Sequence, residues 1–380
     1  MKILVPGKTL GILGGGQLGR MFALEAKRMG YRVVTLEPTL DSPCGQVADE
    51  QIQADYTDEK ALRALSELAD VITYEFENID AGAVEFLESF GKPVYPNSRV
   101  LRISQDRLLE KQFLKDAGLA VTEFLAVESL AELQEAARTV GLPAVIKTVR
   151  GGYDGKGQAI VSDMEAAAAA FERLYQGQPL IWEKKVSFQK ELSVVACRGI
   201  AGVAKAYPVS ENIHVENILD TAMVPARISK AASQKAVEMA EAVGEALGII
   251  GTYCVELFLV ENDGILVNEI APRPHNSGHY TLDACRCSQF EQQIRAICGL
   301  PLGSTEILNP SVMINLIGDG GGHILRGTEK VLREKNLVLH LYGKSKAEPK
   351  RKMGHFTVVE KTLEAALAIA QVSRKLLFWG

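Results

Sequence analysis

The chain has 380 residues, 47 % of them apolar and 23 % charged, and its 42 basic and 47 acidic side chains leave a formal net charge of −5. This balance excludes a protein whose main task is to coat nucleic acid or an anionic membrane. Six cysteines without a C-x-x-C pair exclude a disulfide framework and a zinc or redox motif of that kind. No apolar run approaches the roughly 18 residues of a membrane span, and no secretory leader pattern is evident, so we expect a cytoplasmic protein of about two or three domains.

The first hundred residues alternate strand-like and helical patterns. Apolar runs at 8–13, 31–36 and 71–74 alternate with helical periodicity after Gly16 and over 58–69 and 81–90. This alternation predicts a parallel α/β domain, which we place at 1–103. Ser104 is expected to cap a helix over 105–117.

Strands follow one another more closely after that helix, which predicts a mixed α+β architecture. We divide this part into 104–178, 179–300 and a small C-terminal lobe at 301–380. The expected strands cover 144–148, 158–162, 179–186, 192–198, 203–209 and a hairpin of 252–260 with 265–270, and the expected helices cover 164–175 and 230–247.

Glycines gather at 14–16, 151–152 and 320–322, and clustered glycine suggests backbone that approaches a ligand closely. Residues 14–19 satisfy G-x-G-x-x-G between a strand and a helix, and Glu37 lies 18 residues beyond Gly19, as in a dinucleotide fingerprint. Free amides at a helix start accept any anion. Pyrophosphate, a substrate monophosphate and a tight turn without a ligand therefore all remain open.

A second glycine-rich loop, 150–158, joins two strands and is therefore not a Walker-type P-loop. Four glycines around Lys156 suit a flap that closes over phosphates, and Lys147 on the preceding strand is placed to project beneath it. A glycine-rich hairpin without function and an exposed strand lysine are the alternatives.

The hairpin near 252–270 predicts a metal site. In an antiparallel hairpin the residue numbers of directly opposed residues have a constant sum. If the loop is 262–263 or 261–264, that sum is 525, and Glu256 stands opposite Glu269. Two opposed carboxylates repel each other unless a divalent cation lies between them, and Mg²⁺ prefers carboxylates together with phosphate oxygens. A shifted register that leaves one glutamate in solvent is the alternative.

Two further polar segments follow. Residues 268–279 form a loop rich in donors, in which Arg273 offers a planar fork for phosphate or carboxylate. A zinc site of His275 and His279 is disfavoured because Pro274 and Gly278 oppose a helix there. The basic cluster at 344–352 is either a solvated tail or a lobe that holds phosphate.

Together these segments resemble the ATP-grasp superfamily and, within it, the ligases that carboxylate aminoimidazole ribonucleotide in purine biosynthesis. The resemblance extends over essentially the whole chain. The segments that carry it, in the family's order, are 14–20, 73–77, 105–107, 152–158, 268–279 and 351–355. Lys350 stands where the family usually has a small residue. The resemblance implies a Rossmann-like pre-ATP-grasp domain, two ATP-grasp subdomains with ATP between them, a C-terminal lobe and a homodimer.

The resemblance also assigns residues to ligands. The ATP-binding residues would be Arg107, Lys147, Gly152, Tyr153, Asp154, Gly155, Lys156, Gly157, Gln158, Glu183, Lys184, Lys185, Val186, Glu191, His214, Asn268 and Glu269. Glu256 and Glu269 would hold Mg²⁺ or Mn²⁺. The residues facing aminoimidazole ribonucleotide would be Gln17, Leu18, Glu75, Tyr153, Arg273, His275, Asn276, Ser277, Lys344, Arg351 and Lys352, and the catalytic ones Asp154, Arg273, His275 and Lys352.

The chemistry that the resemblance implies joins ATP and bicarbonate to carboxyphosphate, whose carboxyl group passes to the exocyclic amine of 5-aminoimidazole ribonucleotide. The partners would be these small molecules, with a transient hand-off of product to the downstream mutase and no nucleic acid or membrane. Two rivals are a nicotinamide-dependent oxidoreductase, supported by residues 14–19, and a non-catalytic nucleotide-binding protein. Other ATP-grasp ligases, with a different acceptor, remain the nearest alternative.

Overall fold

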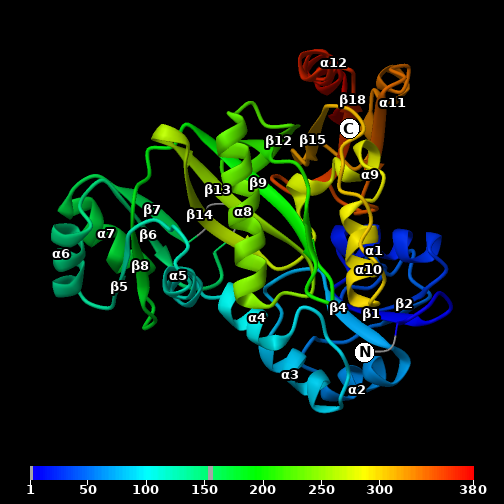
Figure 1. Ribbon diagram of the computed structural model, residues 1–380, viewed down its shortest axis with the longest axis horizontal. Coiled ribbons are helices and arrows are strands. Elements are labelled where there is room, and N and C mark those ends of the chain that lie inside the picture. Colours follow the sequence, from blue (N-terminus) through cyan, green and yellow to red (C-terminus); the bar gives the residue numbers. More distant parts are fainter. Residues whose placement is uncertain (1–2, 153–156) are drawn as a thin grey trace.

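The computed structural model describes residues 3–152 and 157–380. Its N-terminal part is an all-parallel sheet in the order β3-β2-β1-β4, formed by β1 (Thr9–Leu13), β2 (Arg32–Leu36), β3 (Glu50–Ile52) and β4 (Val71–Tyr74). The helices of this part are α1 (Gln17–Arg28), α2 (Glu59–Leu68), α3 (Ala81–Ser89) and α4 (Ser98–Ser104). The predicted parallel α/β, Rossmann-like unit is therefore confirmed, and it forms the blue and cyan region of Figure 1.

The expected helix over 105–117 begins two residues later, and its predicted cap is wrong. Asp106 caps α5 (Arg107–Asp116) by accepting from the amides of Leu108 and Leu109. Ser104 is instead the last residue of α4, where its hydroxyl donates to the carbonyl of Val100 at 2.9 Å. The short helix α4 was not expected, because its seven residues hold too few apolar positions to show a period.

A second, smaller sheet has the antiparallel order β5-β8-β6-β7 and lies to the left in Figure 1. Its strands are β5 (Phe124–Val127), β6 (Ala144–Thr148), β7 (Gln158–Val161) and β8 (Leu180–Lys184), and its helices are α6 (Leu130–Thr139) and α7 (Met164–Leu174). β5 and α6 were not predicted. The glycine-rich loop does join two antiparallel neighbours, β6 and β7.

The largest sheet crosses the expected boundary near residue 300. Its order is β14-β13-β9-β11-β12-β15-β18-β17, with β10 beside β9. The strands are β9 (Lys190–Arg198), β10 (Ala204–Ala206), β11 (Ser210–Val215), β12 (Ile218–Val224), β13 (Gly251–Val260), β14 (Gly264–Ala271), β15 (Ser311–Ile317), β17 (Leu337–Leu341) and β18 (Lys352–Val359). Because β12 pairs with β15, the C-terminal strands β15, β17 and β18 continue the central sheet.

Helices complete the packing around this sheet. α8 (Lys230–Leu247), which matches its predicted bounds, places Ala232, Ala236 and Ala240 in one core with strands β9 and β13. α10 (Gln289–Ile297) was not expected; it packs against both β13 and α1 and so joins the central sheet to the N-terminal unit. The remaining elements are α9 (Thr281–Ala284), β16 (Leu325–Arg326), α11 (Thr328–Val331), α12 (Leu363–Leu376), β19 (Phe378–Trp379) and the 3₁₀ turns Glu261–Asp263 and Asn276–Gly278.

Candidate active site

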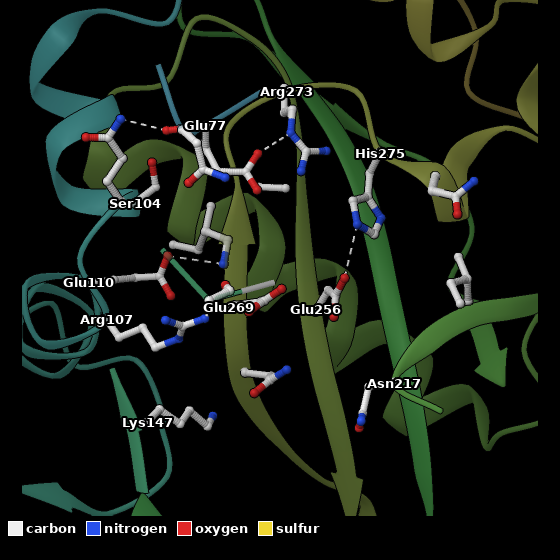
Figure 2. A pocket seen from close by; sticks show the side chains of 18 of the residues that line it. Glu77, Ser104, Arg107, Glu110, Lys147, Asn217, Glu256, Glu269, Arg273 and His275 are labelled. Carbon is white, nitrogen blue, oxygen red and sulfur yellow. Dashed lines mark hydrogen bonds and ion pairs between the residues drawn. The ribbon is translucent and has the colours of Figure 1, made fainter. Parts of the chain in front are cut away.

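A polar cavity of about 430 Å³ lies where the small sheet, the central sheet and the N-terminal unit meet. Figure 2 shows its lining side chains pointing inward from β6, α5, β13, β14 and the loop after β14. The structure brings the following predicted residues together in its walls: Arg107, Lys147, Gly152, Gln158, Glu191, His214, Glu256, Asn268, Glu269, Arg273, His275, Asn276 and Lys352. Residues that lie far apart in the sequence, from Arg107 to Lys352, therefore converge on one cleft.

Glu256 and Glu269 are direct cross-strand partners, as predicted, but the register arises differently. The turn has three residues, Glu261–Asp263, and pairs near it sum to 524, as in Leu257 with Val267. A β-bulge between Glu256 and Leu257 then adds one residue to β14 and brings Glu269 opposite Glu256. The expected two- or four-residue loop is thus wrong, because Asn262 and Asp263 take left-handed φ of 57° and 55°.

The two carboxylates have different surroundings. The Glu256 carboxylate lies 3.1 Å from Nε2 of His275. Desolvation opposes ionisation of Glu256, but the hydrogen bond and charge of His275 outweigh it and lower the pKa of Glu256 to about 2. Desolvation and the charge of Glu256 raise the pKa of Glu269. The pair therefore concentrates negative charge on one face of the cleft.

Positive charge faces that pair from α5 and β6. The Lys147 ammonium lies 3.0 Å from the Glu183 carboxylate, and the buried Lys111 ammonium lies 3.8 Å from the same oxygen. Lys111 also donates to the carbonyl of Asn268 at 3.1 Å, at the bulge. Arg107 donates to the carbonyls of Thr148 and Gly152 at 2.8 and 2.6 Å and so holds the end of β6 and the start of the glycine-rich loop.

Glu110 and Lys111 were missed by the sequence reasoning. Both are buried on α5, and Glu110 accepts from the amide of Ile270 at 3.2 Å. Burial and the charge of Glu269 raise the pKa of Glu110 well above its usual range. The signal was present, because Lys111 lies one helical turn from Leu114 on the buried face, where an apolar residue is normal.

The loop after β14 is held from several directions. Arg273 is paired with Glu77 of the N-terminal unit, and Asn276 exchanges amide hydrogen bonds with Asn315 at 3.0 and 2.6 Å. The imidazole of His275 bonds through Nδ1 to Ser277 Oγ at 2.8 Å, and Ser193 donates to the same oxygen at 2.7 Å. Ser277 therefore lies behind the ring of His275 and is fully buried.

Those of the remaining predicted residues that the structure describes do not line this cavity. Gly157 lies beside the end of β6, because the amide of Thr148 donates to its carbonyl at 2.9 Å. Glu183 lies on β8, the other neighbour of β6. Lys184, Lys185 and Val186 lie at and just after the end of β8, with both lysines exposed. Tyr153, Asp154, Gly155 and Lys156 lie outside the described residues.

The N-terminal glycine turn is filled by the protein's own carboxylates. Glu37 accepts from the amide of Gly15 at 2.9 Å, and Glu75 accepts from the amides of Gly19, at 2.6 Å, and Gly16. A Cβ at Gly15 would approach Glu37 Cγ to 2.3 Å, so glycine is required for this close approach. The amides of this turn therefore bond to carboxylates of the protein itself. Gln17 is partly exposed at the start of α1, whereas the Leu18 side chain packs in the core.

The side chains of the basic cluster at 344–352 lie partly in the cleft and partly on the surface. Lys352 lines the cavity, and Lys344 donates to its carbonyl at 2.7 Å. Arg351 donates to the carbonyl of Lys346 at 3.3 Å, while Lys350 makes an exposed ion pair with Glu216 at 2.8 Å. Lys350 is therefore exposed and does not line the cavity.

His275 and His279 do not form a metal pair. His275 contacts Glu256 and Ser277, whereas His279 Nδ1 contacts Gln289 at 3.1 Å. A different group, Asp283 with His340 and His355, has ligand-type atoms within 4.8 Å of one another. The two imidazoles stack with centroids 4.6 Å apart at 15°, so their faces, rather than their nitrogens, meet. We therefore interpret this group as a packing cluster.

Comparison with known proteins agrees with the order of these parts. Residues 7–105 match the preATP-grasp domain of ribonucleotide synthetases, residues 112–290 match the ATP-grasp domain, and residues 311–369 match the C-terminal domain of phosphoribosylaminoimidazole carboxylase. The fold and the cleft define an ATP-dependent ligase of the ATP-grasp class. The chain is 47 % identical over 363 residues to the N5-carboxyaminoimidazole ribonucleotide synthase of Bacillus subtilis, covering 95 % of this chain and 93 % of the relative. It belongs to the N5-carboxyaminoimidazole ribonucleotide synthase family.

Solved structures support the same family. The chain matches an ADP complex of an N5-carboxyaminoimidazole ribonucleotide synthetase with a TM-score of 0.93, 47 % identity and 98 % coverage of each chain. It matches the Aspergillus clavatus synthase in complex with ADP and 5-aminoimidazole ribonucleotide with a TM-score of 0.90, 34 % identity and coverage of 97 % and 98 %. The oxidoreductase interpretation of residues 14–19 is therefore wrong. Within residues 3–152 and 157–380, no helix has both the length and the apolar character needed to cross a membrane.

Proposed function

We propose that this chain uses ATP and bicarbonate to carboxylate the exocyclic amine of 5-aminoimidazole ribonucleotide, giving N5-carboxyaminoimidazole ribonucleotide. The observation that carries the proposal is the single cleft in which opposed glutamates, the cations of Lys147 and Arg107, and the loop with Arg273 and His275 face one another. The side of the cleft with Glu256, Glu269 and Lys147 suits a nucleotide with its metal ion, and the loop side with Arg273 suits an anionic second substrate.

In this proposal a bicarbonate oxygen attacks the γ-phosphorus of ATP, and ADP leaves with the electron pair of the broken bond. The amine nitrogen then attacks the carboxyl carbon of carboxyphosphate, phosphate leaves, and the nitrogen loses one proton. Lys147 and Arg107 stabilise negative charge near the nucleotide, which is the main requirement of phosphoryl transfer. Asp154 and His275 remain the candidates for the proton acceptor, and closure of the flap around Tyr153 and Lys156 would exclude water.

Glu256 and Glu269 would hold Mg²⁺, or Mn²⁺, in this cleft. The residues fit such an ion, because two carboxylates are opposed across the sheet and the charge on Glu256 raises the pKa of Glu269. A hard cation relieves that repulsion and, when bound, neutralises phosphate charge. Asn268 and Glu191 supply further oxygens in the same wall.

We also propose the division into 1–103, 104–178, 179–300 and 301–380, a cytoplasmic homodimer, and transfer of product to the next enzyme. In the proposed substrate region, Glu75, Gln17 and Leu18 lie at the N-terminal turn, while Asn276, Ser277, Arg273 and Lys352 line or support the loop side of the cleft. Lys344 and Arg351 would face the ribonucleotide phosphate.

We expect ADP release to require both bicarbonate and 5-aminoimidazole ribonucleotide. A coupled assay with each component omitted in turn measures this, with other amine and carboxylate acceptors as controls. ADP release with a different acceptor and none with the ribonucleotide would reject the assignment, whereas NAD(H) binding without Mg-ATP binding would reject the whole class.

The affinity for the ribonucleotide should fall as the pH rises from 7 to 9. Desolvation and the charge of Arg351 lower the pKa of Lys344 to about 8, so its ammonium is charged below pH 8 and loses its charge above it. The KM for the ribonucleotide should therefore rise over this range, and Lys344→Arg should flatten the profile. Lys346→Arg, at an exposed position, is the matched control. An unchanged profile in Lys344→Arg would remove Lys344 from the phosphate site.

A further inference from the structure

The buried side-chain amide of Gln289 makes hydrogen bonds to both the backbone amide and the backbone carbonyl of His275. Gln289 is the first residue of α10 and is fully buried. Its Oε1 accepts from the amide of His275 at 2.8 Å, and its Nε2 donates to the carbonyl of His275 at 2.8 Å. A single amide therefore fixes both backbone groups of one loop residue.

The same amide also orients the other end of the loop. Because Oε1 accepts from the His275 amide, the two ends of the Gln289 amide are assigned, and Nε2 is a donor. Nδ1 of His279 lies 3.1 Å from Nε2 of Gln289 and must therefore accept a hydrogen bond from it. The ring proton of neutral His279 is then on its other nitrogen, Nε2 of the imidazole. A Cβ at Gly278 would lie 2.6 Å from Oε1 of Gln289, so loop and amide are in close contact.

The side chain of His275, whose backbone Gln289 holds, lines the cleft. Its ring lies between Glu256, 3.1 Å from Nε2, and Ser277, 2.8 Å from Nδ1, and Figure 2 shows it pointing inward beside Arg273. Where the ring points depends on the backbone of His275, since Ser277 belongs to the same short loop. Gln289 itself does not line the cavity.

We propose that Gln289 is a positioning residue for carboxyl transfer, which acts by fixing the backbone of His275 and so holding its imidazole between Glu256 and Ser277 on the loop side of the cleft. The inference rests on the proposed role of His275. The contacts of Lys147 and Arg107 involve neither Gln289 nor His275, so nucleotide binding by these two residues should not depend on Gln289. Misplacement of a reacting group by about 1 Å can lower a rate by about 100-fold, which makes such a residue measurable.

The same helix supplies a matched control. Gln292 is also fully buried, and its amide binds both backbone groups of Gly303, at 2.9 Å to the amide and 3.0 Å to the carbonyl. Gly303 does not line the cavity. The two glutamines thus make the same kind of contact, one to a loop of the cleft and one to a remote loop.

We would compare Gln289→Met with Gln292→Met in the full chain, because methionine keeps the volume and removes the amide. Both variants should lose similar thermal stability. In Gln289→Met alone, kcat should fall about 10-fold, the KM for ATP should stay unchanged, and more ADP should be released per ribonucleotide carboxylated. Equal activity of the two variants would overturn the inference. If Gln289→Met does not fold, Gln289→Glu, which keeps the acceptor for the His275 amide but loses the donor to its carbonyl, should have a lower kcat than Gln292→Glu, and equal kcat in these two variants would overturn the inference.

A double-mutant cycle with His275→Asn separates this inference from the proposed function. If Gln289 acts through His275, adding Gln289→Met to His275→Asn should change kcat no further. If instead the fold-losses in kcat of the two single variants multiply in the double variant, the two residues act independently and the inference is overturned. Inactive His275→Asn with fully active Gln289→Met would reject only the role of Gln289, whereas fully active His275→Asn would reject the role of His275 itself.

Discussion

Replacing Glu269 by glutamine should lower metal-dependent ADP formation by at least about 100-fold, because one of two metal-binding carboxylates is lost. The substitution should not destabilise the fold. Glu269 stands directly opposite Glu256, and removing one of two opposed charges should raise the free energy of unfolding by about 0.2–1 kcal/mol. The expected result is therefore an inactive enzyme that is as stable as the parent or slightly more so.

Steady-state ADP release at increasing Mg²⁺ concentrations, together with urea unfolding, measures both effects. Glu261→Gln is the matched control, since Glu261 lies exposed in the turn of the same hairpin. Near-normal activity of Glu269→Gln would remove Glu269 from the metal site. Loss of activity accompanied by a large loss of stability would instead identify Glu269 as a structural residue.

Replacing Lys111 by methionine should lower the free energy of unfolding by about 3 kcal/mol, because it leaves a buried carboxylate with less compensation. Lys111 and Glu183 are both buried, and one oxygen of Glu183 has no hydrogen-bond partner among the described residues. Lys147 alone would then neutralise Glu183. The carbonyl of Asn268 would also lose its donor at the bulge, so we expect a higher KM for ATP.

Lys115→Met is the control for Lys111→Met, since Lys115 lies exposed on the same helix. Urea denaturation should show a clear shift of the midpoint for the first variant and little change for the second. If the two variants unfold alike, the ion pair of Lys111 contributes nothing to stability. In Lys111→Met with Glu183→Gln, part of the lost stability should return, because the buried carboxylate of Glu183 is removed while Lys147 loses its ion-pair partner.

The sequence predicted local pattern well and long-range placement less well. The bounds of α8 could be read from periodicity, whereas the pairing of Glu256 with Glu269 was predicted from a turn length that is wrong and holds because the bulge shifts the register by one residue. The bulge could not be predicted, because the number of residues in a turn follows from backbone angles such as the left-handed φ of Asn262. Lys111 escaped notice because its partners, Glu183 and Asn268, lie far along the chain.

Two sequence predictions concerned the glycine motifs, and their outcomes differ for a physical reason. The pattern at 14–19 indicates only free amides at a helix start, and it could not show that Glu37 and Glu75 would occupy them. The loop at 150–158 was correctly placed between antiparallel strands, because the flanking residues show strand rather than helix periodicity. Its central residues, 153–156, remain a prediction.

The pairing of β12 with β15 has a consequence for dissecting this protein into parts. A chain cut near residue 300 would leave the buried strand β12, seven apolar or buried residues long, without its neighbour. Its open backbone groups would form a ready template for strands of other molecules, which favours aggregation. The two fragments should therefore be insoluble when made separately and should recover solubility only when produced together.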